Sequence, residues 1–256
     1  MTALRDGATL DAPFLVVKGL TMRFGGICAL AEVSFDVAQG GITGLIGPNG
    51  AGKTTCFNCI TRLYQPTSGS VALGGDDLLS YPAHTIARRG IARTFQNVAL
   101  FAHMSVLDNV LVGFHCRLRG RAGARLSEAQ ARLEATAILE YLELGAVSAR
   151  PVLGLPFGTR KAVELARALV AKPELLLLDE PAAGLNHTEV EALGERIARI
   201  SRDFGTTILM VEHHMGLVMG ISNHIVVLDS GRKLADGPPQ AIQRDPAVIE
   251  AYLGTT

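Results

Sequence analysis

The sequence contains no tryptophan, only four cysteines and no surplus of charge of either sign. Lys and Arg total 24, and so do Asp and Glu, so bulk charge gives no reason to expect a nucleic-acid partner. The longest strongly apolar stretches, 175–178 and 207–211, are far below the roughly 20 residues that cross a bilayer. Residues 1–11 lack the basic start and apolar block of a secretory signal. These absences favour a cytosolic chain without a membrane-spanning segment.

Four cysteines are too few for a disulfide framework in a chain of 256 residues, so reduced thiols are expected. Cys56 and Cys59 form a C-x-x-C pattern, which could be a redox pair or half of a zinc site. A second ligand pair at zinc spacing is absent from the sequence, and both residues fall on one face of a predicted helix. We therefore interpret them as packed helix residues.

A chain of this length with 48% hydrophobic side chains can form one large α/β domain with a substantial core. Short segments with nearby glycines predict an antiparallel β subdomain near the N-terminus, at Phe14–Val17, Glu32–Val37 and around Ser70–Leu73. Continuous apolar runs predict the buried strands of a mostly parallel sheet, at Gly41–Ile46, Glu174–Leu178, Thr206–Val211 and Ile225–Leu228.

Helices are predicted over Gly52–Leu63 and Thr188–Arg202, between these strands. Between Asn97 and Pro156 the strand pattern fades. Apolar residues recur there near helical spacing, at Leu133, Ala137, Tyr141 and Leu144. An α-helical subdomain, inserted at about 97–160, is therefore expected.

A glycine-rich segment after the strand at 41–46 matches the pattern G-x-x-x-x-G-K-T and leads into a helix. Glycines let successive backbone N–H groups curve around phosphate oxygens, and the helix N-terminus adds positive potential. In this pattern Lys53 bridges the β- and γ-phosphates, the Thr54 hydroxyl holds Mg²⁺, and Thr55 reaches the α-phosphate. The predicted phosphate-binding residues are Gly47, Pro48, Asn49, Gly50, Ala51, Gly52, Lys53, Thr54 and Thr55.

The apolar run 175–178 ends abruptly in two carboxylates, Asp179 and Glu180. Strand ends in parallel sheets direct side chains toward ligands. We expect Asp179 to hold Mg²⁺ through water and Glu180 to accept a proton from the water that attacks the γ-phosphate.

Together these motifs resemble those of ATP-binding cassette (ABC) ATPases, and the resemblance runs from about Val16 to Leu253. It implies a P-loop NTPase (RecA-like) core in a single ATPase domain at 12–256, preceded by a tail at 1–11. Gln96 matches the family's glutamine loop, whose side chain contacts Mg²⁺ and the attacking water, and His213 matches the histidine switch near the γ-phosphate. Phe24 resembles the aromatic residue that stacks on adenine, although a core aromatic remains an alternative.

The resemblance also implies head-to-tail pairs, in which a signature segment of one subunit closes the nucleotide site of the other. That segment is Leu155–Lys161 here, and it departs from the family's L-S-G-G-Q at Pro156, Phe157 and Thr159 but keeps Gly158. The N-terminus of the following helix can still bind the γ-phosphate, and we expect the site that this segment serves to be weaker because the serine is missing. In the loop after Glu180, Asn186 stands where the family usually has Asp.

Four segments resemble the ATPase subunit of branched-chain amino acid importers (Liv-type, hydrophobic amino acid uptake family): residues 22–26, 156–158, the loop ending at Asn186, and 245–254. This implies ATP and Mg²⁺ as cofactors. The implied partners are a second ATPase subunit, expected to be a different chain, and two integral membrane permeases. It also implies a peripheral location on the cytoplasmic face of the inner membrane, with no direct cargo contact. Val98, Leu100, Phe101 and Met104 are candidate permease contacts or, equally, internal packing residues.

Several alternatives stay open. Another cargo, such as amides or urea, a lipid-linked export substrate, or homodimeric pairing would fit the same motifs. A soluble ABC ATPase is disfavoured because the chain has one phosphate loop and no coiled coil. A P-loop kinase or GTPase would not need Gln96, His213 and the Gly158 segment together.

Overall fold

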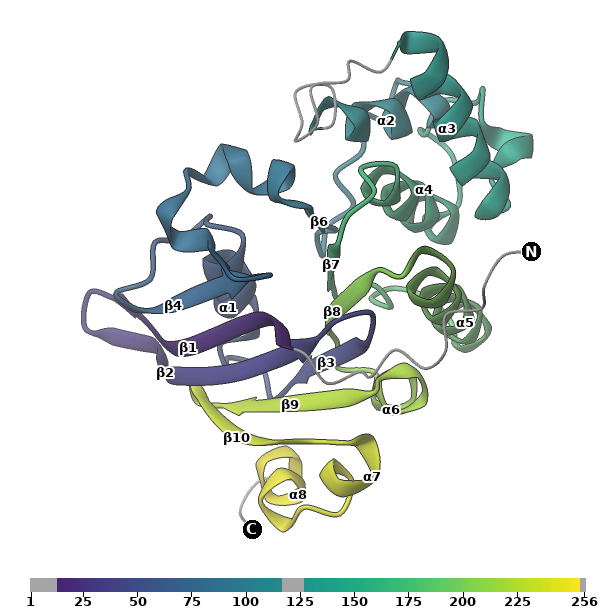
Figure 1. Ribbon diagram of the computed structural model, residues 1–256. Coiled ribbons are helices and arrows are strands. Elements are labelled where there is room, and N and C mark those ends of the chain that lie inside the picture. The colour runs from purple at the N-terminus through teal and green to yellow at the C-terminus, as the bar shows by residue number, and fades with distance from the viewer. Residues whose placement is uncertain (1–12, 117–126, 254–256) are drawn as a thin grey trace, which may run out of the picture.

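The computed structural model describes residues 13–116 and 127–253, so the predicted tail at 1–11 lies outside the described residues (Figure 1). A curved antiparallel sheet has the strand order β2-β1-β4-β5. The predicted antiparallel subdomain is thus confirmed, but its first two strands are longer than predicted. The bounds are β1 Pro13–Phe24, β2 Ile27–Ala38, β4 Ser68–Leu73 and β5 Asp76–Asp77.

The second sheet has the order β10-β9-β3-β8-β7-β6. Its neighbours from β9 to β6 pair in parallel, as the continuous apolar runs predicted, whereas β10 pairs antiparallel with β9. The short strands β6 and β10 were not predicted. The bounds are β3 Ile42–Ile46, β6 Ile91–Arg93, β7 Leu175–Asp179, β8 Thr207–Val211, β9 His224–Asp229 and β10 Arg232–Gly237.

Local signals in the sequence explain where several helices begin and end. Helix α5 begins with a capping box between Asn186 and Glu189 and stops before Gly205, which adopts φ 63°. Helix α1 ends earlier than predicted because Arg62 turns the chain with a left-handed φ of 63°. The α-helices are α1 Lys53–Ile60, α2 Val106–Val112, α3 Glu128–Tyr141, α4 Phe157–Leu169, α5 His187–Phe204, α6 Met215–Ile221, α7 Pro239–Ile242 and α8 Pro246–Leu253; the 3-10 helices are η1 Leu78–Ser80, η2 Ala83–Arg89, η3 Gly113–Cys116 and η4 Gly145–Val147.

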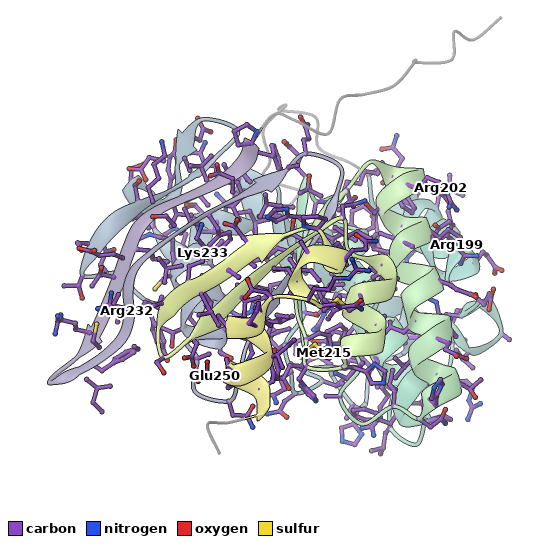
Figure 2. All side chains as sticks on the ribbon, turned by 90° about the horizontal axis from the view of Figure 1, so that it is seen from below. Arg199, Arg202, Met215, Arg232, Lys233 and Glu250 are labelled. Carbon is purple, nitrogen blue, oxygen red and sulfur yellow. The ribbon has the colours of Figure 1, made fainter. Side chains whose placement is uncertain are left out.

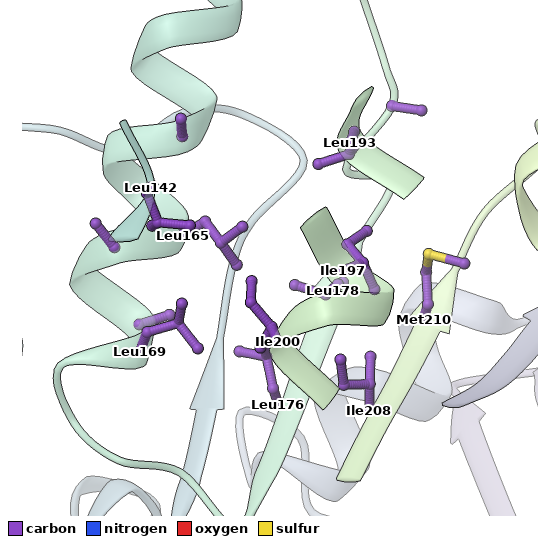
Figure 3. Packing of buried hydrophobic residues seen from close by; sticks show 14 of the residues in the cluster. Leu142, Leu165, Leu169, Leu176, Leu178, Leu193, Ile197, Ile200, Ile208 and Met210 are labelled. Atoms are coloured by element: carbon purple, nitrogen blue, oxygen red, sulfur yellow. The ribbon is translucent and has the colours of Figure 1, made fainter. Parts of the chain in front are cut away.

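The parallel sheet separates two hydrophobic cores. Alternate residues of β7 point to opposite faces: Leu176 and Leu178 join one core, and Leu175 and Leu177 join the other. The first core lies among β7, β8, α4 and α5, where Leu165, Ile197 and their neighbours interlock (Figure 3). The second fills the space between the two sheets around α1. Burial on both faces holds the ends of the parallel strands in fixed positions.

Helices α2 and α3 lie between β6 and β7 in the chain and pack with α4 at the end of the molecule away from the antiparallel sheet (Figure 1). At the opposite end, β10 forms the edge of the sheet beside β9 and packs against α8; Figure 2 shows this face, with Lys233 on β10 and Glu250 on α8. Within residues 13–116 and 127–253, no helix is both long and apolar enough to cross a membrane.

Candidate functional site

The predicted phosphate loop connects β3 to α1, and its glycines are required by close backbone contacts. Gly47 has φ 148°, and a Cβ there would lie 2.0 Å from the carbonyl oxygen of Leu228. At Gly52, with φ 99°, a Cβ would lie 2.7 Å from the carbonyl oxygen of Ala29. Gly50 has open space around the corresponding position. The loop therefore rests tightly on β9 and β2 while its outer side is open to a ligand.

Lys53, the first residue of α1, folds back across this loop. Its Nζ donates hydrogen bonds to the carbonyl oxygens of Gly47 (2.8 Å) and Pro48 (2.9 Å). Burial lowers the pKa of the Lys53 ammonium, and the nearby carboxylates of Glu180 and Asp179 oppose that shift. Thr54 is exposed and Thr55 half-buried at the start of the same helix. The sequence thus places a cation and two hydroxyls beside the loop's N–H groups.

Asp179 is the last residue of β7 and is 4% exposed. Its Oδ2 lies 2.6 Å from an Nη of Arg93, which ends the neighbouring strand β6. Because two parallel strands end side by side, the carboxylate and the guanidinium meet at one edge of the sheet.

Glu180 follows immediately, and its left-handed φ of 47° turns it out of the strand direction. Its Oε2 accepts a hydrogen bond from Nε2 of Gln96 (2.8 Å), and Nδ1 of His213 lies 3.8 Å away. The side chain of His213 is 58% exposed and that of Glu180 18% exposed. The structure therefore brings the three predicted catalytic residues together, from the ends of β6, β7 and β8.

Glu212 was not predicted to take part in the site. It is fully buried and accepts hydrogen bonds from the backbone N–H groups of Ala182 (2.7 Å), His213 (2.9 Å) and His214 (3.0 Å). It thus joins the turns that follow β7 and β8. The available signal was an acidic residue at the end of an apolar strand, directly before the histidine pair. His214 has a separate role, because its side chain caps α6.

Lys161 on α4 was also missed. Its Nζ donates to the carbonyl oxygens of Glu180 (3.2 Å) and Gln96 (3.4 Å). Burial lowers the pKa of this ammonium, and attraction from Glu164, Glu212, Glu180 and Asp179 opposes the shift. The signal was a lysine on the apolar side of an amphipathic helix. Through Lys161, the helix that carries the signature segment touches the catalytic turns of its own chain.

Phe24 lies at the end of β1, is 42% exposed and makes an edge-to-face contact with Tyr64, with ring centroids 5.2 Å apart. Gly158 lies in the first turn of α4, where the atoms nearest to an added Cβ belong to Glu189 and Leu185. Phe157 packs on Gly184. In this chain the signature segment therefore contacts the loop after β7 and the start of α5.

Cys56 and Cys59 are buried, and burial raises the pKa of both thiols, that of Cys59 to about 11. Among the described residues, no group of three or more His, Cys, Asp or Glu side chains could hold a metal ion. The burial of both thiols agrees with the interpretation of the C-x-x-C pattern as helix packing.

The residues predicted for Mg²⁺ offer oxygen atoms only: the Thr54 hydroxyl, the Asp179 carboxylate and the Gln96 amide. Mg²⁺ prefers hard oxygen ligands and in phosphate-transfer sites takes few from the protein, the rest coming from phosphates and water. This donor set fits Mg²⁺, and it does not require a dedicated carboxylate cage.

A glycine-rich loop before a helix, a carboxylate pair at the end of a buried parallel strand and a glutamine and histidine beside that pair define a P-loop nucleotide hydrolase. Residues 30–183 match the family model described as ABC transporter, and residues 232–256 match that of a branched-chain amino acid ATP-binding cassette transporter. The chain belongs to the ABC transporter family and is an ATPase of its nucleotide-binding cassette type.

Known relatives match this chain over nearly the full length of both proteins. The chain is 45% identical to the high-affinity branched-chain amino acid transport ATP-binding protein BraF of Pseudomonas aeruginosa, over 96% of this chain and 99% of that protein. It is 44% identical, with the same coverage, to LivG of Escherichia coli. Among solved structures it resembles the ADP conformation of an ATP-binding cassette of an ABC transporter, with a TM-score of 0.86, 30% identity and coverage of 95% and 100%.

Proposed function

We propose that this chain is the ATP-hydrolysing subunit of a membrane importer for branched-chain or other hydrophobic amino acids. Support for hydrolysis comes from the contact of Glu180 with Gln96 and its proximity to His213 beside the phosphate loop. Support for the cargo comes from the similarity to BraF and LivG and from the match at 232–256. The subunit would sit peripherally at the cytoplasmic face of the membrane, without contact to cargo or nucleic acid.

In this proposal the loop 47–52 binds the phosphates through its backbone N–H groups, and Lys53 exchanges its carbonyl partners for β- and γ-phosphate oxygens. Thr55 reaches the α-phosphate, and the Phe24–Tyr64 pair supplies an aromatic surface for adenine. Thr54, Asp179 and Gln96 hold Mg²⁺. When bound, Mg²⁺ would neutralise charge that develops on the phosphate oxygens.

Glu180 is the proposed general base. Its Oε2 would take a proton from the attacking water, which Gln96 orients through its side-chain amide. His213 lies on the same side of Glu180 and would donate a hydrogen bond to the γ-phosphate. Glu212 accepts hydrogen bonds from the backbone N–H groups of His213 and of Ala182, two residues after Glu180, and would hold the turns that carry His213 and Glu180 in place.

A second ATPase subunit would complete each site. Gly158 lies in the first turn of α4 beside Glu189, and in the pair it would face the nucleotide of the other subunit. Pro156 precedes α4 and offers no side-chain cap. The first backbone N–H groups of α4 therefore remain available to a γ-phosphate. A different chain or a second copy could take the partner position.

The permease contact is proposed at a groove of about 490 Å³ between η2 and α4. Phe101 is 52% exposed and lines this groove, while Leu100 packs against the core. Val98 and Met104 lie in the same segment. The groove walls are mainly apolar, with side chains that include Leu63, Ile86, Phe95, Phe101 and Val112. Such a surface suits an apolar helix from one permease subunit.

Purification of the chain from native membranes tests the proposal: two permeases and a second ATPase should accompany it. Amino acid uptake by the reconstituted assembly then identifies the cargo. Phe101→Asp should reduce uptake and leave basal ATP hydrolysis intact, whereas Leu133→Asp, at a 72% exposed position on α3, should affect neither. Equal loss of uptake and hydrolysis in Phe101→Asp would contradict the docking role. Recovery of the chain without membrane proteins would contradict transport itself.

A further inference from the structure

Arg93 is a buried cation for which the phosphate-site motifs give no role. Its side chain is 7% exposed, and that of its ion-pair partner Asp179 is 5% exposed. An arginine so far from water requires compensation by several partners. Here those partners belong to three separate segments of the chain.

One Nη of Arg93 contacts Oδ2 of Asp179 at 2.6 Å. The other donates to Oδ1 of Asn58 (2.7 Å) and to Oγ1 of Thr61 (3.1 Å) at the end of α1, the helix that begins with Lys53. The planar guanidinium therefore spans from the helix of the phosphate loop to the end of β7. A lysine ammonium could not make both contacts in this forked geometry.

Aromatic rings restrict the guanidinium further. The Cζ atom of Arg93 lies 4.9 Å from the ring centroid of Phe95 and 5.5 Å from that of Phe57. Phe95 immediately precedes Gln96. The ion pair is thus held by α1 and by the glutamine loop, both of which contribute to the nucleotide site.

We propose that Arg93 is a positioning residue that orients the Asp179 carboxylate for Mg²⁺. Arg93 occupies Oδ2 and fixes the plane of the carboxylate, which leaves Oδ1 to accept from the hydration shell of a cation at Thr54. This inference rests on the proposed role of Asp179 in holding Mg²⁺. It assigns Arg93 no contact with nucleotide or metal.

The two physical effects of Arg93 on a cation have opposite signs. As a charge, a guanidinium repels Mg²⁺, so its removal alone would strengthen Mg²⁺ binding. As a support, it holds the carboxylate in place, so its removal would weaken Mg²⁺ binding. Loss of a group that supports a metal ligand commonly lowers metal affinity by about 10- to 100-fold, and we expect support to dominate.

The experiment measures the dissociation constant of ADP for the purified chain with excess Mg²⁺ and with EDTA. The dissociation constant in EDTA divided by the dissociation constant in Mg²⁺ is the ratio of interest. It reports how strongly Mg²⁺ contributes to ADP binding, independently of hydrolysis. In Arg93→Met the ratio should fall by about 10-fold or more. Binding in EDTA should change by less than about threefold, because the loop and Lys53 hold the phosphates without metal.

Arg93→Lys and Asn58→Ala provide variants that leave the buried charge balance intact. Each should lower the ratio in the same direction by a smaller factor, and these two decide the outcome if Arg93→Met fails to fold. Arg89→Met is the matched control: Arg89 also pairs with a carboxylate, Asp76, and stacks on an aromatic ring, Tyr81, outside the site. It should leave the ratio unchanged.

An unchanged or increased ratio in Arg93→Lys and Asn58→Ala overturns the positioning role. Asp179→Asn separates this result from failure of the proposed function. If Asp179→Asn lowers the ratio but the Arg93 and Asn58 variants do not, Asp179 holds Mg²⁺ without help from Arg93. If Asp179→Asn leaves the ratio unchanged, the proposed Mg²⁺ role of Asp179 is wrong, and the inference about Arg93 falls with it.

Discussion

Replacement of Glu180 by Gln tests the chemistry of the site directly, because it removes one ionisable oxygen and preserves the size of the side chain. The contact with Gln96 can persist, since the new amide still offers an oxygen to Nε2 of Gln96. The backbone N–H of residue 180 keeps its bond to the carbonyl oxygen of Val211. The variant should therefore keep the geometry of the site and lose only the proton acceptor.

The expected magnitude follows from general base catalysis. Loss of a positioned base lowers the rate by about 10²- to 10⁴-fold, which corresponds to about 3–5 kcal/mol of barrier. Nucleotide affinity should be retained or slightly increased, because a carboxylate near Lys53 and the phosphates is removed. The variant should thus bind ATP and hydrolyse it hardly at all.

The assay follows phosphate release per site by the purified assembly with its second ATPase subunit, together with equilibrium binding of ATP to the same preparation. Glu191→Gln is the control, because Glu191 pairs only weakly with His187 on the exposed face of α5. A Glu180→Gln rate within tenfold of the wild-type rate, at equal affinity, would refute the assignment of Glu180 as general base. Loss of ATP binding would indicate instead that Glu180 maintains the structure of the site.

Three further perturbations probe the nucleotide site and the interior. Gly47→Ala should abolish ATP binding, because the added Cβ would collide with a backbone carbonyl oxygen. Gly50→Ala places its Cβ in open space and should lower the stability of the loop conformation by only about 1 kcal/mol, because of its left-handed φ. Isothermal titration with ATP compares the two variants. Phe24→Ala should weaken ATP binding by about 1–3 kcal/mol through lost stacking and spare inorganic triphosphate binding; equal effects on both ligands would contradict the adenine contact. Cys59 is buried and its pKa is raised to about 11, so it should be alkylated more slowly than half-buried Cys28 between pH 8 and 10; peptide mapping of the modified thiols checks this.

The mostly parallel sheet could be predicted because its strands are buried on both faces, so their sequences are continuous apolar runs such as 175–178. The edge strand β10 could not be predicted from its sequence, because Arg232–Gly237 carries charged and polar residues on its exposed side. Its pairing with β9 follows from a tight turn through Ser230 and Gly231, both with positive φ. Edge strands are determined more by such turns and by their neighbours than by their own composition.

Motifs identified Gln96, Asp179, Glu180 and His213 because each stands at a recognisable position after a strand. Residues that support them carry no local signal of that kind. Tyr252 illustrates the limit: it lies on α8, far along the chain, yet its hydroxyl lies close to the backbone of Gly47 in the phosphate loop. Only the folded arrangement of β9, β10 and α8 makes that contact possible.

Charge balance explains why the supporting residues of this site are themselves ionisable. Asp179, Glu180 and Glu212 place three carboxylates at the ends of two adjacent strands. Lys53, Arg93 and Lys161 approach the same strand ends from α1, β6 and α4. Attraction from these carboxylates opposes the lowering of the pKa that burial causes at Lys53 and Lys161. Because every cation comes from a different element, this arrangement of opposite charges exists only when those elements are packed together, and catalytic competence depends on the whole fold.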